Sequence, residues 1–320
     1  MRLRAARFSP VYLAAFIVAA LVASLPIFGN PYQVTVAVNL CITLILTLSL
    51  NFVVGYSGQF HLSHAAFFDV GAYASAILAK QGHISPWLCL VGAILVVAVL
   101  AALIGLPVTR LKGLYLAVAT LAFSLFIEVL VNQGGAVTGG GYGIQEIPPL
   151  ALFGVRLSGK SFYLLALVAV TIIIIGLNNL LESKFGREII AVRDHPNAAA
   201  AAGINPAATR LVVLVIAASL AAVAGWLHTF YYLNLNPVVV SPELTFVWFF
   251  MVLVGGLGSM TGVVLGTVLL TLGPEFLGFA AGQTTLAIGI LLVAVTLFAP
   301  RGIAGLIADL RRKASAEVAA

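Results

Sequence analysis

Hydrophobic residues occupy long unbroken runs along most of this chain, and polar residues gather between the runs. A helix needs about 20 apolar residues to cross a bilayer. Six runs approach or exceed that length, over residues 11–28, 34–54, 86–107, 111–131, 161–181 and 211–233. Four shorter runs cover residues 65–79, 244–254, 262–273 and 284–299. The pattern predicts an all-α, polytopic integral membrane protein, one domain over residues 1–320, with about 8–10 transmembrane or half-spanning helices.

The composition agrees with this pattern. Hydrophobic residues make up 62% of the chain and charged residues 8%, with a mean hydropathy of +1.14. Soluble globular proteins have about 45–50% apolar and about 25% charged residues, so that class is excluded. The net charge of +6 is interpreted as a topology signal and not as a nucleic-acid surface. Cys41 and Cys89 lie in apolar runs without metal-ligand spacing, so we expect neither a disulfide framework nor a metal site.

The basic residues predict an orientation. Of the 16 Lys and Arg residues, only Lys80, Arg156 and Lys160 fall outside four groups, at the two termini, at residues 110–112 and at residues 182–210. Because cytoplasmic loops carry an excess of basic residues, we expect all four groups in the cytoplasm. The prediction is an N-in/C-in protein with an even number of crossings, whose N-terminal run is an uncleaved anchor.

Glycines interrupt the apolar pattern at two places, called here the first glycine break (residues 54–58) and the second glycine break (residues 255–262). A continuous span over 244–273 would place the C-terminal basic group outside, so the second break should reverse the chain. The run 244–254 makes only about 16 Å of helix, which favours a re-entrant hairpin over a tight turn between two full crossings. Paired breaks in two halves of a chain indicate a transport site. The candidate residues are Gly55, Ser57, Gly58, Gly255, Gly256 and Gly258.

Polar residues at membrane depth supply four further candidates for a translocation path or gate, namely Gln59, His64, Asp69 and Glu128. Ionisable residues inside a membrane are costly, and they commonly mark functional sites. The alternative is that His64 and Asp69 only satisfy backbone groups freed by the first break, or each other, at the cytoplasmic end. Glu128 could equally extend to the outer surface. His61 would share a face with His64 only if this stretch were helical.

Residues 182–210 form a polar segment with seven charged residues in an otherwise apolar chain. Within it, Asp194 can cap and Pro196 can open a short alanine-rich helix, which Gly203 would close. Asn205, followed by proline, would start the next helix in the same way. The polar segment is therefore predicted to be a folded cytoplasmic loop that another protein can bind.

Residues 154–161 match the phosphate-loop pattern, in which glycine amides surround phosphates and a lysine reaches the terminal one. That pattern needs a preceding parallel strand and a following soluble helix. Here it precedes a membrane span directly, so we reject it as a nucleotide site. We expect no cofactor bound by this chain, no catalytic residue and no enzyme activity; any ATP and Mg would be handled by a partner.

An ordered set of short motifs resembles the permeases of ATP-binding-cassette importers for branched-chain and other hydrophobic amino acids, closest to the LivM type. The motifs are Gly55-Tyr56-Ser57-Gly58-Gln59, His64-Ala65-Ala66-Phe67, Gly71-Ala72-Tyr73, Leu111-Lys112-Gly113-Leu114-Tyr115, Thr120-Leu121-Ala122-Phe123, Thr138-Gly139-Gly140, Gly143-Ile144, Gly186-Arg187, Ala191-Val192-Arg193, Ala198-Ala199, Gly203-Ile204-Asn205, Ser241-Pro242-Glu243, Gly255-Gly256-Leu257-Gly258-Ser259 and Pro300-Arg301-Gly302. Each motif alone is weak. Together they cover nearly the whole chain from Leu50 to Gly305.

The resemblance implies a type II-like importer permease in a bacterial inner membrane. Its implied partners are a second, LivH-like permease subunit, two cytoplasmic ATP-binding-cassette ATPases and an extracytoplasmic substrate-binding protein, with no nucleic acid. The polar segment would be the coupling loop that seats on the ATPase. The implied coupling residues are Gly186, Arg187, Arg193, Ala198, Ala199 and Gly203.

The chain departs from the family pattern in ways that concern the solute more than the class. Pro196 stands where the family commonly has an acidic residue, and Leu125 replaces a usual glutamate one turn before Glu128. The family usually has small residues at the positions of His61, Ser63 and Asp69.

Two other functions remain open at this point. An ion-coupled secondary transporter would use Asp69, His61, His64 or Glu128 as proton or sodium groups. An intramembrane enzyme lacks a visible nucleophile and base at suitable spacing. The sequence leaves open which solute is carried, and whether the permease pairs with a copy of itself or with a homologue.

Overall fold

The computed structural model describes residues 30–109, 111, 113–152, 154–237, 243–276, 289 and 302–305. The predicted runs at 11–28 and 284–299, and the basic residues of both termini, lie outside this part of the chain. The described elements, in order, are α2 (Pro31–Asn51), η2 (Phe52–Tyr56), α3 (His64–Lys80), α4 (Pro86–Val108), α5 (Leu114–Gln133), α6 (Gly135–Thr138), η3 (Gly140–Tyr142), β1 (Ala151–Leu152), β2 (Val155–Arg156), α7 (Lys160–Glu182), α8 (Lys184–Asp194), α9 (Pro196–Ala201), α10 (Pro206–Tyr232), α11 (Glu243–Gly255) and α12 (Met260–Phe276).

Five helical stretches are long and apolar enough to cross a membrane, which confirms the all-α membrane class and five of the long predicted runs. They are α2 with η2, α4, α5, α7 and α10. Proline occupies the first turn of three of them, where its missing N–H costs nothing. Asn30 caps α2, and Asn205 caps α10 by accepting from the amides of Ala207 and Ala208, as predicted for Asn205.

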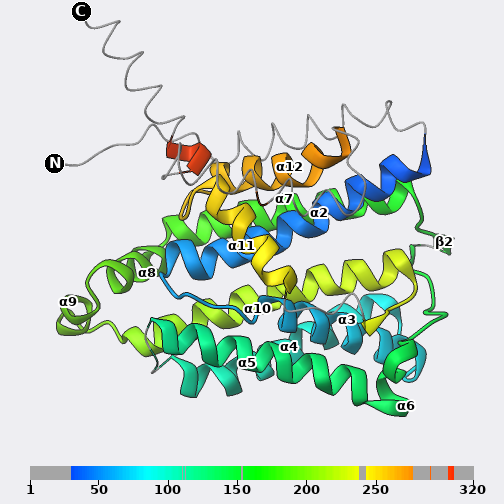
Figure 1. Cartoon of the computed structure of the whole chain (residues 1–320), viewed down its shortest axis with the longest axis horizontal. Coiled ribbons are helices and arrows are strands. Elements are labelled where there is room, and N and C mark those ends of the chain that lie inside the picture. The colour runs from blue at the N-terminus through cyan, green and yellow to red at the C-terminus, as the bar shows by residue number, and fades with distance from the viewer. Residues whose placement is uncertain are drawn as a thin grey trace, which may run out of the picture.

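Two helices form the centre of the bundle. Helix α2 packs against α7, α10, α11 and α12, while α10 also packs against α3 and α4, and α5 lies beside α3. Figure 1 shows α12, α7 and α2 on one side of the bundle and α3, α4 and α5 on the other, with α10 between them. The most apolar window of α2 is 83% buried, against 28% for α4 and 33% for α5. The outer helices α4 and α5 therefore carry the large exposed apolar surface that a membrane protein turns outward.

Small residues let α3 and α10 approach closely. A Cβ atom added to Gly225 would lie 2.3 Å from the carbonyl oxygen of Phe68, and one on Gly71 would lie 2.5 Å from the Cα of Ala222. Such contacts permit only glycine at these positions. They are the usual way in which helices associate within lipid, where apolar burial alone does not drive helices together.

The polar segment forms the end of α7, then α8, α9 and the start of α10. Figure 1 shows α8 and α9 at one end of the bundle and the β2 hairpin and α6 at the opposite end. Gly203 has a φ of +84° just after α9, and Pro196 begins that helix, as predicted. The prediction for Asp194 was wrong, because Asp194 is the last residue of α8 and His195 occupies the cap position.

The second glycine break reverses the chain, as predicted. Helix α11 ends at Gly255, α12 begins at Met260, and the two helices pack together as a hairpin. A Cβ atom on Gly255 would lie 2.4 Å from the carbonyl oxygen of Gly262, so the two backbones touch at the turn. The 13 residues of α11 span about 20 Å. That length fits the re-entrant alternative, because a full crossing needs about 30 Å.

Candidate functional site

The two glycine breaks lie against each other. The first break follows α2 through η2, a single π-helical turn, and ends the helix at Ser57. The backbone N–H of Gly258 donates to Asn51 Oδ1 at 2.9 Å. A Cβ atom on Gly55 would lie 2.2 Å from that same Oδ1 and 2.4 Å from the Gly258 nitrogen. The two breaks, far apart in sequence, thus form one backbone-to-backbone junction.

Arg193 joins this junction to the polar segment. Its Nη1 donates to the carbonyl oxygen of Gly55 at 3.0 Å, and its Cγ would lie 2.7 Å from a Cβ atom on Gly58. The same Nη1 lies 3.6 Å from the Cβ position of Gly258. One side chain of α8 therefore bonds to the first glycine break and lies beside the second, and it fills the space next to Gly58.

Asp194 orients the Arg193 side chain. The Nε of Arg193 donates to Asp194 Oδ1 at 2.8 Å, while Nη1 is used at Gly55. The hydrogen bond from Arg193 lowers the pKa of the Asp194 carboxyl below its ordinary value. Because the bond favours the ionised form, it persists at neutral pH and is lost as the pH falls through that lowered pKa.

A second contact links the first break to the other end of the polar segment. Gln59 Nε2 donates to Ser57 Oγ at 2.8 Å and to the carbonyl oxygen of Arg210, at the start of α10, at 3.2 Å. Ser57 and Gln59 are both buried. The polar segment therefore contacts this short stretch of chain at two points, Arg193 and Arg210.

Hydroxyl groups from neighbouring helices hold the unwound chain that follows. Thr120 Oγ1 accepts from the N–H of Leu62 at 2.9 Å, and Thr245 Oγ1 accepts from the N–H of Ala65 at 3.0 Å. His64 Nε2 lies 2.7 Å from Ser49 Oγ. Non-helical backbone inside a membrane requires such covering by protein. His64 therefore links the start of α3 to α2, and its role in a solute path stays a prediction.

His61 and His64 do not share a helix face. His61 lies in the unwound stretch, with Nδ1 2.9 Å from Ser63 Oγ, whereas His64 is the first residue of α3. His61 Nε2 and Asn51 Nδ2 are buried without a hydrogen-bond partner among the described residues. The part of the chain that the structure describes brings together no group of three potential metal ligands.

The remaining path candidates, Asp69 and Glu128, lie on a different pair of helices, α3 and α5. Asp69 is 3% exposed and Glu128 is partly exposed. Their carboxylates are close enough to interact electrostatically. Both residues were predicted from the sequence as path candidates. Nothing in the sequence indicated that their carboxylates would interact.

The predicted coupling residues do not all face outward. Ala198 and Gly203 are exposed, whereas Ala199 is only 4% exposed and lies on the buried side of α9. Gly186 is crowded by the backbone of Leu181, at the corner where α7 turns into α8. Arg187 is exposed and donates to the carbonyl oxygen of Glu182 at 3.3 Å.

A pocket of about 290 Å³ lies between α8 and α10, beside the polar segment. Its lining residues are Phe185, Glu188, Gly203, Ile204, Asn205, Ala208, Thr209 and Val212. Among them, only Gly203 was predicted from the sequence as a coupling residue. Asn205 was expected only as a helix cap, and Ile204 only as part of a family motif. An apolar pair beside an exposed glycine is the signal that could have indicated the pocket.

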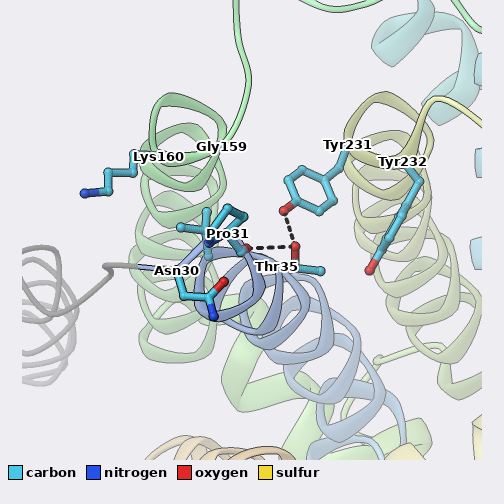
Figure 2. Close-up of a pocket in the computed structure, with 8 residues that line it drawn as sticks. Asn30, Pro31, Thr35, Gly159, Lys160, Tyr231 and Tyr232 are labelled. Carbon is cyan, nitrogen blue, oxygen red and sulfur yellow. Dashed lines mark hydrogen bonds between the residues drawn. The ribbon is translucent and has the colours of Figure 1, made fainter.

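A second pocket, of about 590 Å³, lies at the opposite end of the bundle. Figure 2 shows it between the starts of α2 and α7 and the end of α10, with Tyr231 pointing toward Thr35 and Lys160 at its edge. Tyr231 Oη lies 2.9 Å from Thr35 Oγ1, and Tyr232 Oη donates to Asn39 Oδ1 at 3.0 Å. Sequence analysis missed this pocket, because its lining comes from three separate helices.

Lys160 belongs to the phosphate-loop match, and the structure gives that match the wrong surroundings. The preceding strands β1 and β2 are two residues each and pair antiparallel, with Leu152 opposite Val155. Lys160 is the first residue of α7, a helix long and apolar enough to cross a membrane. The parallel strand and soluble helix of a nucleotide site are therefore replaced by a small hairpin and an apolar helix.

Comparison with known proteins identifies relatives over most of the chain. The chain is 32% identical over 303 residues to the "High-affinity branched-chain amino acid transport system permease protein LivM" of Salmonella typhimurium, covering 87% of this chain and 71% of that protein. It is 32% identical over 315 residues to the protein of the same name in Escherichia coli, covering 90% and 74%.

An archaeal relative matches a shorter part of the chain. This is the "Probable branched-chain amino acid transport permease protein LivM" of Methanocaldococcus jannaschii, 29% identical over 185 residues, with 55% of this chain and 54% of that protein covered. No solved structure matches the chain significantly. Residues 32–300 match the family described as "Branched-chain amino acid transport system / permease component". The chain therefore belongs to this family of branched-chain amino acid transport permeases.

Proposed function

We propose that this chain is the membrane-spanning permease subunit of an ATP-driven importer for branched-chain or other hydrophobic amino acids. Family membership and the helical architecture support this function. The single observation that carries the mechanism is the contact of Arg193, from the polar segment, with the junction of the two glycine breaks. A solute path gated at this junction would be controlled from the polar segment.

The proposed partners follow from this assignment. Two cytoplasmic ATPases supply the energy, a second homologous permease subunit completes the path, and an extracytoplasmic binding protein delivers the solute. ATP and Mg act on the ATPases. The chain would lie in the inner membrane in the N-in/C-in orientation, with the polar segment in the cytoplasm. The exposed small residues Ala198 and Gly203 suit close contact with a partner.

Coupling would pass from the ATPase to the gate through α8. Closure of the ATPases would shift α9 and α8 together, because Ala199 packs inward and the two helices contact each other. Arg193 would then pull on the Gly55 carbonyl, and Gln59 would follow the start of α10. Since the backbones of Gly55 and Gly258 touch, a small shift of one break changes its fit against the other.

The decisive test replaces Arg193 in the complete importer reconstituted in proteoliposomes. We expect Arg193→Gln to reduce ATP-driven leucine uptake about tenfold or more, because the bond to Gly55 loses its charged donor. Unstimulated ATP hydrolysis should remain, whereas its stimulation by solute-loaded binding protein should fall. Arg193→Lys should rescue only partly, since an ammonium lacks the planar fork that serves Gly55 and Asp194 together.

Arg156→Gln, an exposed change in β2 at the other end of the bundle, is the matched control and should leave uptake intact. Wild-type uptake and wild-type stimulation in Arg193→Gln would exclude the proposed coupling route. Uptake that continues without ATP, driven by a proton or sodium gradient, would instead support the secondary transporter and exclude the ATP-driven importer.

A further inference from the structure

Two neighbouring helices, α3 and α5, each carry one carboxylate in an apolar bundle. Asp69 lies in the second turn of α3 and is 3% exposed. Glu128 lies about three-quarters of the way along α5 and is partly exposed. The proposed coupling route through Arg193 uses neither residue.

The packing of α3 on α5 places the two carboxylates on neighbouring helices. The N–H of Leu62, just before α3, bonds to Thr120 in α5, and the rings of Phe67 and Phe123 lie 5.8 Å apart. Both helices therefore advance in the same direction from these contacts. Asp69 and Glu128 follow shortly after them, and the two carboxylates interact electrostatically.

Neither carboxylate is neutralised by a basic side chain of the described chain. The ion pair found among the described residues joins Arg193 to Asp194, in the polar segment. Two neighbouring carboxylates in an apolar bilayer are costly unless they pair with a cation or take up protons. A positively charged group bound between them would remove this cost without proton uptake.

Tyr73 supplies a third polar atom to the same place. It lies one helical turn after Asp69 on α3, so the two side chains share a face, and Tyr73 interacts electrostatically with Asp69. Tyr73 is only 4% exposed, and its buried hydroxyl has no hydrogen-bond partner among the described residues. A buried hydroxyl without a partner is rare in folded proteins, and here it points to a ligand.

We propose that Asp69, Glu128 and Tyr73 form a binding site for a primary ammonium group. An ammonium has three N–H donors, which two carboxylates and one phenolic oxygen can accept. Glu128 is partly exposed and provides the way in, while Asp69 and Tyr73 form the buried wall. The inference rests on the proposed function, in which this ammonium is the α-ammonium of the amino acid in transit.

The first test uses the wild-type complete importer in phosphatidylcholine nanodiscs, which lack lipid amines. Dicyclohexylcarbodiimide modifies carboxyl groups in apolar surroundings, and mass spectrometry measures the reaction at Asp69 and Glu128. We expect leucine and 3-methylbutylamine to slow modification about tenfold, because both carry an ammonium. We expect no effect of 4-methylpentanoate, which has only the carboxylate.

Equal protection by all three compounds, or protection by none, overturns the site. Protection that appears only when phosphatidylethanolamine is added assigns the site to a lipid headgroup and overturns the role in amino-acid transit. Protection by sodium alone at matched ionic strength overturns an ammonium site in favour of an inorganic cation.

The second test measures leucine uptake by the complete importer with Glu128→Gln, Asp69→Asn or Tyr73→Phe. We expect uptake to fall roughly ten- to hundredfold for Glu128→Gln, with assembly and unstimulated ATP hydrolysis unchanged. Glu146→Gln, in the exposed loop after η3, is the matched control. Glu128 is partly exposed, so its replacement tests the site even if the buried Asp69→Asn variant fails to fold.

The two proposals fail in different ways. ATP-driven uptake that is unchanged in Glu128→Gln and Tyr73→Phe refutes the ammonium site and leaves the importer standing. Uptake that never depends on ATP refutes the importer, whatever the carboxylate variants do.

Discussion

Arg193 is suited to its place because a guanidinium can serve several acceptors at once. Its Nε faces Asp194 while Nη1 faces the Gly55 carbonyl. The side chain is 36% exposed, so water competes for its charge and the carboxylate partner contributes little stability by itself. The planar group instead fixes a direction, from the surface of α8 toward the junction of the glycine breaks.

Gly55 provides a residue-scale test of the junction. We expect Gly55→Ala to destabilise the protein by about 1–3 kcal/mol, because the new methyl would overlap Asn51 Oδ1 and the Gly258 nitrogen. Thermal unfolding in detergent measures the change, and uptake should fall with it.

Gly176 in α7 is the matched control, because a Cβ atom added there meets nothing within 4 Å. Gly176→Ala should be neutral or stabilising by up to about 1 kcal/mol, since alanine is the better helix former. Equal melting temperatures for Gly55→Ala and wild type would show that the two breaks can separate freely.

Helices α8 and α9 give the polar segment a defined fold. Ser183 caps α8 by accepting from the N–H of Gly186, and the buried residues Ile189 and Val192 give α8 one apolar face. The single turn of α9 would be unstable alone, because helices this short need tertiary support. Ala199 supplies that support, which leaves the exposed positions of α9 free for a partner.

Ala198 gives an element-scale prediction. We expect Ala198→Trp to abolish co-purification with the ATPase, or the stimulation of its ATP hydrolysis, because a large ring would hold the surfaces apart. The chain should still fold, since Ala198 is exposed. Val155→Trp, at an equally exposed place in the hairpin of the opposite end, should have no effect. Normal coupling in Ala198→Trp would mean that the ATPase docks elsewhere.

Sequence patterns predicted the helices better than they predicted the contacts between the helices. The apolar runs, with proline or asparagine at their starts, indicated the long helices and both glycine breaks. Helix α8 was missed because its few apolar residues are separated by charged ones, and this placed Asp194 wrongly as a cap. The meeting of Gly55, Gly258 and Arg193 could not be predicted, because only the packing of α2, α8 and α11 brings these three positions together.

At the scale of the whole molecule, the two ends of the bundle differ in character. One end carries the polar segment and the 290 Å³ pocket, and the other carries the hairpin, the glycine-rich turn after α6 and the 590 Å³ pocket. In the proposed function, the α3 and α5 carboxylates and the junction of the glycine breaks would line the path of a solute between these ends. This separation suits delivery of the solute at one end and control of the path at the other.

The orientation is testable with single cysteines, because Cys41 and Cys89 are both buried. We expect Ala198→Cys to react with a membrane-impermeant maleimide only after the cells are opened. Tyr142→Cys should react in intact spheroplasts, since Tyr142 is 87% exposed at the opposite end. The reverse pattern would place the polar segment outside and would rule out docking to a cytoplasmic ATPase.

The π-helical turn η2, at the junction of the glycine breaks, contains an extra residue that a change of winding would release. A π-helical turn contains one residue more than an α-helical turn closed by the same carbonyl. Rewinding η2 as α-helix would free that residue and rotate Ser57 and Gly58 by about 100° around the axis of α2. The Gly55 carbonyl would then turn away from Arg193, while the buried part of α2 upstream kept its packing. Such a change would be confined to five residues and would break the bond between Arg193 and the Gly55 carbonyl.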